Sequence, residues 1–278
     1  MSERFSHQAD RARIDRAAAA LKAHGIDAVI VGDAATARAE VLDRIPAGSD
    51  VFTMSSITLD TAGITAALNE SSDYVSVRNK LYALDRATQG AEMRALGAAP
   101  SWAVGSVQAI TESGELVIAS MTGSQLSAYV YGAEKVIFVV GAQKIVKDLG
   151  EAHARVREHA LPLESERAKA AYGVPGSAIN KILEIHGDFP GRIAVIIVEH
   201  IFSRLSQLPG KVDPRQRMSA VLNATIEVGR PTLFSMLIII AAHIPIFTLQ
   251  RHEGRIFAPM AWSVTSALVG SLILSLTL

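Results

Sequence analysis

The chain has 278 residues, with 27 Lys and Arg against 27 Asp and Glu, so its formal net charge is zero. This balance provides no basic field for nucleic acid, and no nucleic-acid partner is expected. The absence of cysteine excludes disulfides, thiolate metal sites and a cysteine nucleophile, and no metal or cofactor is expected.

Two regions of different character follow one another along the chain. Residues 1–199 mix charges, glycines and short apolar runs, and the first 25 residues contain no apolar core of signal-peptide length. We therefore expect this region to be a cytoplasmic domain. From residue 233 onward the charged residues are only Arg251, Glu253 and Arg255, which indicates a lipid environment.

The first region alternates between helical and strand-like patterns. Helices are expected over 9–23, 34–45, 59–68, 85–96 and 125–131, and strands over 27–31, 50–54, 73–77, 107–111, 115–120, 135–140 and 192–198. Short apolar strands separated by helices are typical of an α/β fold with a mostly parallel sheet and helices on both faces. The strands at 107–111 and 115–120 are expected to form a hairpin.

Ligands of such sheets bind beyond the carboxyl ends of the strands, and the first candidate loop there is MSSITLDTAG at 54–63. Its hydroxyl residues Ser55, Ser56 and Thr58 precede an expected helix, where an anion such as phosphate or carboxylate is favoured. The alternative is that Ser56 or Thr58 only caps that helix.

Two further loops carry similar chemistry. SMTGSQLSAY at 120–129 places hydroxyl residues and Gly123 between a strand and a helix, and VGAQKIV at 140–146 adds Lys144 after another strand. A lysine there can present a cation to the same crevice, although Lys144 on a solvated helix end is the plainer interpretation. Glu112, at the turn of the hairpin, is a candidate catalytic acid or base, or simply a turn carboxylate.

These segments together resemble the LUD-domain, or lactate-utilisation, family over residues 1–199. The resemblance is carried by MSSITLDTAGI, by the long stretch from Gly105 to Leu149, and by YGVPGSAINKIL at 172–183. It implies a fold like NagB, RpiA and the CoA transferases, with strand-end loops that bind a small anionic metabolite. It also places in the site the residues Ser55, Ser56, Thr58, Thr111, Glu112, Gly123, Ser124, Gln125, Lys144 and Lys181.

The family resemblance further implies a link to bacterial lactate oxidation, with a hydroxy acid, keto acid or phosphate as ligand. Relatives that carry iron–sulfur clusters hold them with cysteines, and this chain has none. Iron–sulfur lactate-utilisation subunits are therefore expected as partners, and enzymatic activity is left open.

A second resemblance begins inside GRIAVIIVEHIFSRL at 191–205. From about residue 198 to the end, the sequence is similar to a small part of the heavy-metal efflux pumps of the RND superfamily. That part spans the end of a fourth transmembrane helix and the fifth and sixth helices. The pump family uses an acidic residue for its charge relay, and the aligned position here is Arg192.

The last region reads as a membrane hairpin. Residues 233–249 and 258–278 contain no Asp, Glu, Lys or Arg, and the second is long enough to cross a hydrocarbon core of roughly 30 Å. Residues 200–230 are expected to be a linker, with an amphipathic helix over 218–229 lying at the membrane surface. The excess of Lys and Arg before the first expected span predicts that the first region stays cytoplasmic, anchored to the inner membrane through a lipid-inserted hairpin.

Three explanations of the whole chain remain open. The first is a lactate-type domain tethered to the membrane. The second, which we favour for the origin of the chain, is a non-functional chimera in which the stretch AVIIVEH allowed a switch between unrelated sequences, ending in a truncation. The third is a component of heavy-metal efflux, which the missing pump domains argue against.

Overall fold

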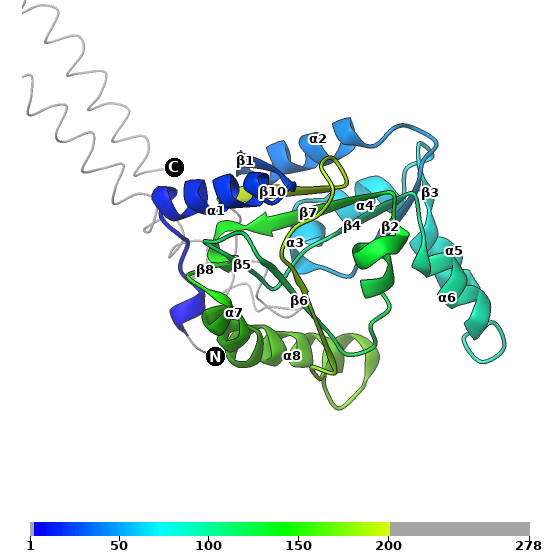
Figure 1. Cartoon of the computed structure of the whole chain (residues 1–278). Coiled ribbons are helices and arrows are strands. Elements are labelled where there is room, and N and C mark those ends of the chain that lie inside the picture. The colour runs from blue at the N-terminus through cyan, green and yellow to red at the C-terminus, as the bar shows by residue number, and fades with distance from the viewer. Residues whose placement is uncertain (1–2, 201–278) are drawn as a thin grey trace, which may run out of the picture. The chain divides into compact units, whose positions relative to one another are not determined.

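The computed structural model describes residues 3–200, in which two sheets are present (Figure 1). The chain divides into two units, Met1–Lys211 and Val212–Leu278, and every described residue belongs to the first. The larger sheet has six strands in the order β1-β10-β7-β4-β2-β3, all parallel. They are β1 (Asp27–Asp33), β10 (Ile193–His200), β7 (Lys135–Gly141), β4 (Trp102–Gly105), β2 (Asp50–Thr53) and β3 (Val75–Ser76).

The smaller sheet has four strands in the order β8-β5-β6-β9. They are β8 (Ile145–Val146), β5 (Ala109–Thr111), β6 (Leu116–Ser120) and β9 (Lys181–Ile185). The pair β5 and β6 is the expected hairpin, and its antiparallel register confirms that prediction.

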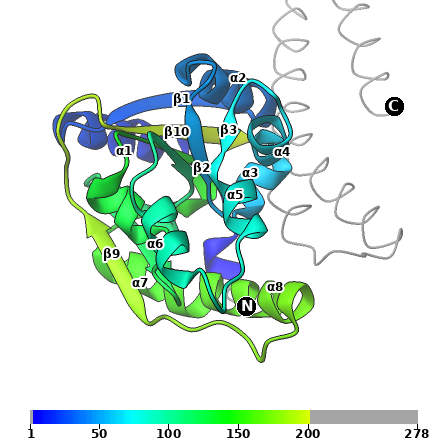
Figure 2. The same ribbon diagram turned by 90° about the vertical axis from the view of Figure 1, so that its right-hand side faces the viewer.

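Helices surround both sheets. The α-helices are α1 (Arg11–Ala23), α2 (Ala34–Arg44), α3 (Ile57–Thr61), α4 (Ile64–Asn69), α5 (Val77–Ala83), α6 (Gly90–Ala98), α7 (Leu149–Arg155) and α8 (Leu161–Tyr172). The short helical segments are η1 (Glu3–Phe5), η2 (Ala128–Gly132), η3 (Ala142–Lys144) and η4 (Val156–Ala160). Two views show α7 and α8 gathered away from α2 and α4 (Figures 1 and 2).

Two neighbouring interior strands of the large sheet, β7 and β10, are apolar along most of their length. Every residue from Val136 to Gly141 and from Ile193 to Val198 is buried. A strand covered on both faces can accept apolar side chains at every position, which is why these two segments read as continuous apolar runs rather than alternating ones.

Different segments cover the two faces of this sheet. On one face α2, α3 and α4 pack Val41, Leu59 and Ile64 against the strands. On the other face lie α1, α5, η2 and the hairpin, with Leu21 and Tyr129 in the core. The segment leaving β2 therefore goes to one face and the segment leaving β4 goes to the other. Such a reversal between neighbouring strands is the kind of position at which α/β sheets commonly bind ligands.

The α/β class with a mostly parallel sheet and flanking helices is confirmed. The helix expected over 59–68 is instead two, because Gly63 adopts a left-handed conformation (φ +68°) between α3 and α4. The helix expected over 85–96 corresponds to α6, which begins at Gly90, and the preceding α5 was not expected; the two lie one after the other in Figure 2. The segment predicted at 125–131 forms a π-helical turn over Ala128–Gly132.

The predicted transmembrane helices at 233–249 and 258–278, and the linker at 200–230, lie outside the described residues. Within residues 3–200, every helix is too short or too polar to cross a bilayer.

Candidate functional site

Polar side chains lie at the carboxyl edge of the large sheet, in the loops and first helical turns that follow four neighbouring strands. Lys144 follows β7, Ser106 follows β4, Ser55 and Thr58 follow β2, and Arg78 follows β3. Because carboxyl ends of parallel strands share one edge, four separate stretches of sequence meet there. The edge includes the point between β2 and β4 where the chain changes face.

Lys144 is the residue that joins these turns. Its Nζ donates to Ser106 Oγ at 2.9 Å and to Thr58 Oγ1 at 3.3 Å. Ser106 Oγ in turn donates to the carbonyl oxygen of Val139 in β7 at 2.6 Å. The amine is thus held by hydroxyl oxygens, and no carboxylate among residues 3–200 forms an ion pair with it.

The electrostatic environment of Lys144 disfavours its charged form. Burial lowers the pKa of Lys144 from 10.5 to about 7, and the positive charge of Arg155 adds to this shift. Arg155 is itself only 3% exposed, and burial lowers its pKa to about 10. It donates to the carbonyl oxygen of Gln108, while its Nε has no partner within the described part of the chain.

Arg78 is a second cation at the same edge. Its Nη2 donates to Ser55 Oγ at 2.8 Å and its Nε to the hydroxyl of Tyr82 at 3.0 Å. Its Nη1 is buried and has no hydrogen-bond partner among residues 3–200. The loop containing Ser55 and Thr58 therefore contacts both Arg78 and Lys144.

The plainer interpretations of this loop do not match its geometry. Ser56 occupies the position before α3 but its side chain makes no capping hydrogen bond. Thr58 is 7% exposed and accepts a hydrogen bond from Lys144. Lys144 lies in the short turn η3 between β7 and β8 rather than on a solvated helix end.

Glu112 lies elsewhere, in a cluster with α1. Its carboxylate accepts from Arg13 Nε at 2.6 Å and from Arg16 Nη2 at 2.6 Å. Burial opposes the charged form, but the hydrogen bonds from Arg16 and Arg13 hold the pKa of Glu112 below its usual value. A carboxylate with both oxygens engaged by guanidinium groups is poorly suited to accept a proton, and its catalytic role remains a sequence prediction.

Thr111, next to Glu112, makes hydrogen bonds within the turn of the hairpin. Its side chain is fully buried and donates to Glu115, which also accepts from Ser113 at 2.7 Å. These contacts close the turn between β5 and β6.

The remaining predicted residues form a third group at the ends of β6 and β9. Ser120 Oγ donates to Gln125 Oε1 at 3.1 Å and accepts from the backbone of Gly123. Lys181 lies opposite Ser120 in the strand pair, and its stem packs on Gly123 so closely that a Cβ there would come within 2.7 Å. Ser124 is exposed. Within residues 3–200 no hydrogen bond or ion pair connects this group to Lys144 or Glu112.

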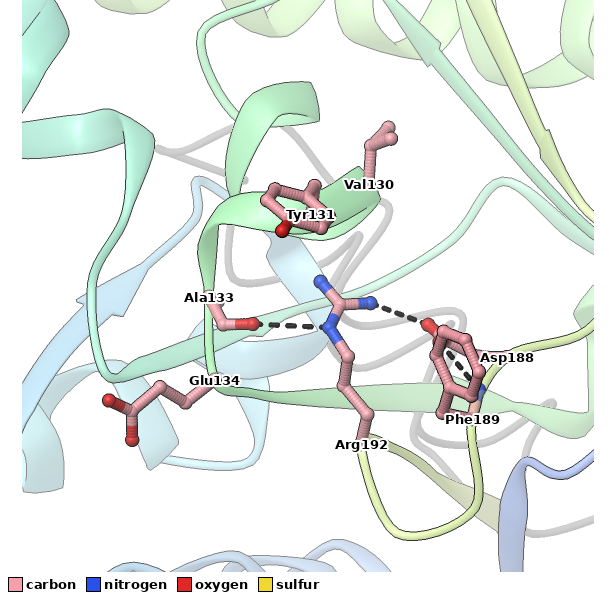
Figure 3. Close-up of a pocket in the computed structure, with 7 residues that line it drawn as sticks. All are labelled: Val130, Tyr131, Ala133, Glu134, Asp188, Phe189 and Arg192. Carbon is pink, nitrogen blue, oxygen red and sulfur yellow. Dashed lines mark hydrogen bonds and ion pairs between the residues drawn. The ribbon is translucent and has the colours of Figure 1, made fainter.

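A pocket of about 300 Å³ lies at the opposite, amino edge of β7 and β10 (Figure 3). Its lining includes the exposed side chains of Tyr131 and Phe189. Arg192 closes it by donating to the carbonyl oxygens of Ala133 and Tyr129 and by pairing with Asp188. With its guanidinium saturated by internal partners, Arg192 is a structural residue of the first unit.

Three residues of the candidate site were missed by sequence reasoning: Ser106, Arg78 and Arg155. Ser106 follows β4, whose run WAVG was too short to register as a strand. Arg78 lies one residue beyond the strand expected over 73–77, where no helix is expected, so the pattern does not reveal its place in the first turn of α5. Arg155 lies in α7, where only its three-dimensional surroundings show that it is buried. Within residues 3–200 no group of His, Cys, Asp or Glu has the arrangement of a metal site.

Comparison with known proteins divides the chain at β10. The LUD domain family model matches residues 14–198, and the AcrB/AcrD/AcrF family model matches residues 193–278. The two matches overlap at 193–198, inside β10.

Curated relatives of this chain include cation efflux proteins. Over 88 residues the chain is 35% identical to cation efflux system protein CusA of Escherichia coli O157:H7 and 42% identical to cobalt-zinc-cadmium resistance protein CzcA of Cupriavidus metallidurans. Each match covers 30% of this chain and 8% of the relative, so the chain spans less than a tenth of those proteins.

A solved structure of a DUF162 family protein from Deinococcus radiodurans is similar with a TM-score of 0.43 and 15% sequence identity, covering 68% of this chain and 99% of that one. The chain carries at its end a segment similar to RND efflux pumps, and through residues 14–198 it belongs to the LUD domain family.

Proposed function

We propose that the LUD unit binds a small anionic metabolite, a hydroxy acid, a keto acid or a phosphate, at the carboxyl edge of its large sheet. Arg78 and Lys144 supply positive charge, and Ser55, Thr58 and Ser106 supply hydroxyls. A carboxylate or phosphate between the two cations would be met by charge-assisted hydrogen bonds, which are stronger than neutral ones.

One observation carries this proposal. Lys144, Arg78 and Arg155 are all at least partly buried, and none of them pairs with a carboxylate within residues 3–200. Cations removed from water are normally paired, because an isolated buried charge is strongly unfavourable. An exogenous anion would provide the missing negative charge.

The biological setting proposed for this binding is lactate utilisation, with a fold of the NagB, RpiA and CoA-transferase kind. Membership of the LUD family supports it. Because the chain has no cysteine, iron–sulfur subunits would be separate partners that perform the electron transfer.

The match of residues 193–278 to the AcrB/AcrD/AcrF family favours a second proposal, that this segment tethers the LUD unit to the inner membrane. The names of CusA and CzcA refer to metal efflux and resistance, but this chain covers only 8% of each of those proteins. A chimeric origin is compatible with two matches that meet inside one strand.

Titration calorimetry on the full chain tests the binding proposal, with lactate, pyruvate and inorganic phosphate as separate probes. Arg78→Gln should lower the affinity for the anion about 10- to 100-fold, as expected for loss of a charge-assisted hydrogen bond. Arg86→Gln is a matched control, because Arg86 is exposed on the loop after the same helix. Equal affinity in both variants, or no binding of any probe, would refute the proposal.

A further inference from the structure

Lys144 has a setting that suits an amine nucleophile better than a fixed positive charge. Its nearest polar partners are two hydroxyl oxygens, and the charged group that influences it is another cation, Arg155. A lysine that serves only as a counter-charge is held protonated by its partner. Here nothing within residues 3–200 stabilises the ammonium form through an ion pair.

The same surroundings keep part of the amine neutral. Burial and Arg155 lower the pKa of Lys144 to about 7. At neutral pH the Lys144 amine is therefore unprotonated in about half of the molecules. Desolvation and a neighbouring cation are the two means by which lysine side chains become nucleophilic toward carbonyl carbons. Lys144 is half-buried as a residue, so part of its side chain is open to solvent.

The position of Lys144 is also fixed. It belongs to the three-residue turn η3, which is held between β7 and β8, and each of those strands is paired in a different sheet. Ser106, which accepts from its amine, is anchored to Val139 of β7. A reactive group set on rigid elements retains its orientation while a ligand binds.

Arg78 completes the chemistry of a 2-oxo acid site. Its planar guanidinium presents N–H donors in a geometry that suits a carboxylate, and its buried Nη1 lacks a partner among the described residues. A ligand with a carboxylate beside a carbonyl group would place its carboxylate at Arg78 and its carbonyl carbon at Lys144. A hydroxy acid would offer the carboxylate but no electrophilic carbon.

We propose that Lys144 forms a Schiff base with a small 2-oxo acid bound at this edge, an inference that rests on the proposed anion-binding function. The neutral amine adds to the carbonyl carbon, forming a C–N bond while the carbonyl oxygen takes up a proton. Loss of that oxygen as water, with the two amine hydrogens accounting for its protons overall, leaves the C=N bond. Ser106 accepts a hydrogen bond from the amine and so orients it for the step, in which no oxidant or reductant is consumed.

Reductive trapping tests the inference on the full chain. The protein is incubated at pH 7 with pyruvate and sodium cyanoborohydride, which reduces the imine to a stable amine, and the adduct is located by peptide mass spectrometry. Lys144 should be labelled at least tenfold faster than Lys147, an exposed lysine of the same segment. Labelling of Lys144 should disappear in Lys144→Arg and persist in Lys147→Arg.

Wild-type competition keeps the test independent of how the variants fold. Lactate, which has no carbonyl group, should slow the trapping of pyruvate at Lys144 and leave the labelling of Lys147 unchanged. Binding of both acids by saturation-transfer NMR without trapping at Lys144 would overturn the Schiff base and leave the binding proposal standing. No binding and no trapping would overturn both.

Discussion

Lys144 Nζ lies 2.9 Å from Ser106 Oγ, which ties the turn after β7 to the turn after β4. The same serine reaches back to the carbonyl oxygen of Val139 in β7. A single hydroxyl therefore links two neighbouring strands at the edge where the chain changes face, and it orients the amine proposed to meet the ligand.

Ser106→Ala should weaken anion binding at this edge about five- to tenfold. The variant removes an acceptor worth about 1 kcal/mol to the amine and frees Lys144 to adopt other rotamers. Calorimetry with pyruvate measures the change.

Ser124→Ala is the matched control for that variant. Ser124 was predicted from sequence to line the site, but it is exposed and its hydroxyl contacts only Thr122 among the described residues. Its affinity for pyruvate should equal that of the wild type. A larger loss for Ser124→Ala than for Ser106→Ala would move the site to the ends of β6 and β9.

Lys144→Met should stabilise the protein at acidic pH. In the folded state the pKa of Lys144 is lowered to about 7 from 10.5, so the unfolded chain binds more protons between those values and stability rises with pH across that window. Below pH 7 the folded protein holds an unfavourable charge. Removing it should raise the free energy of unfolding by about 1–3 kcal/mol.

Chemical denaturation at pH 6 and pH 9 checks this expectation. The difference between Lys144→Met and wild type should shrink as the pH rises. Lys147→Met, on an exposed residue close by, provides the control. A destabilised Lys144→Met at pH 6 would show that the ammonium is favourably accommodated.

Glu112→Gln should lower stability and leave anion binding unchanged. The variant keeps the shape of the side chain but loses two ion pairs with Arg13 and Arg16, in a place where the Glu112 side chain is 20% exposed. We expect a loss of about 1–2 kcal/mol. Because the folded-state pKa of Glu112 is lowered, this contribution is present above the usual carboxyl pKa and lost as the pH falls through the lower value.

Thermal unfolding at pH 7 and pH 3 measures this contribution, with pyruvate binding recorded in parallel. At pH 3 the difference in stability between the wild type and Glu112→Gln should be smaller than at pH 7. Unchanged stability together with lost pyruvate binding would instead support Glu112 as a residue of the site predicted from sequence.

A chain ending at residue 192 should fail to fold, whereas a chain ending at residue 211 should fold. The shorter chain lacks β10, which pairs with β1 on one side and β7 on the other and is buried from Ile193 to Val198. It also loses the contacts of Arg11 and Gln8 with Glu199. Circular dichroism and limited proteolysis distinguish the two outcomes, and a folded shorter chain would show that β10 is dispensable.

The parts of the fold that sequence predicts are those with strong local patterns. The strands β1, β7 and β10 are long apolar runs, and α1 has a clear helical period with Asp10 as its cap. The second sheet was not anticipated as a sheet, because β8 has two residues and β9 is half exposed. Such strands exist because of their partners, which a local pattern cannot reveal.

The candidate site was predicted in part for the same reason. Thr58 and Lys144 were singled out from strand-end chemistry, and the structure brings them together. Gly123 and Lys181 meet each other in a separate place. Glu112 looked like a free turn carboxylate, because its partners Arg13 and Arg16 lie a hundred residues earlier on a helix that packs beside it.

The boundary between the two family matches falls within β10, and this has a consequence for how the chain could have arisen. A doubly covered strand and the interior of a lipid-spanning segment both demand uninterrupted aliphatic side chains, so IAVIIV satisfies either requirement. If the proposed chimeric origin is right, a junction there would leave the α/β unit its last interior strand and leave the pump-like segment an apolar beginning.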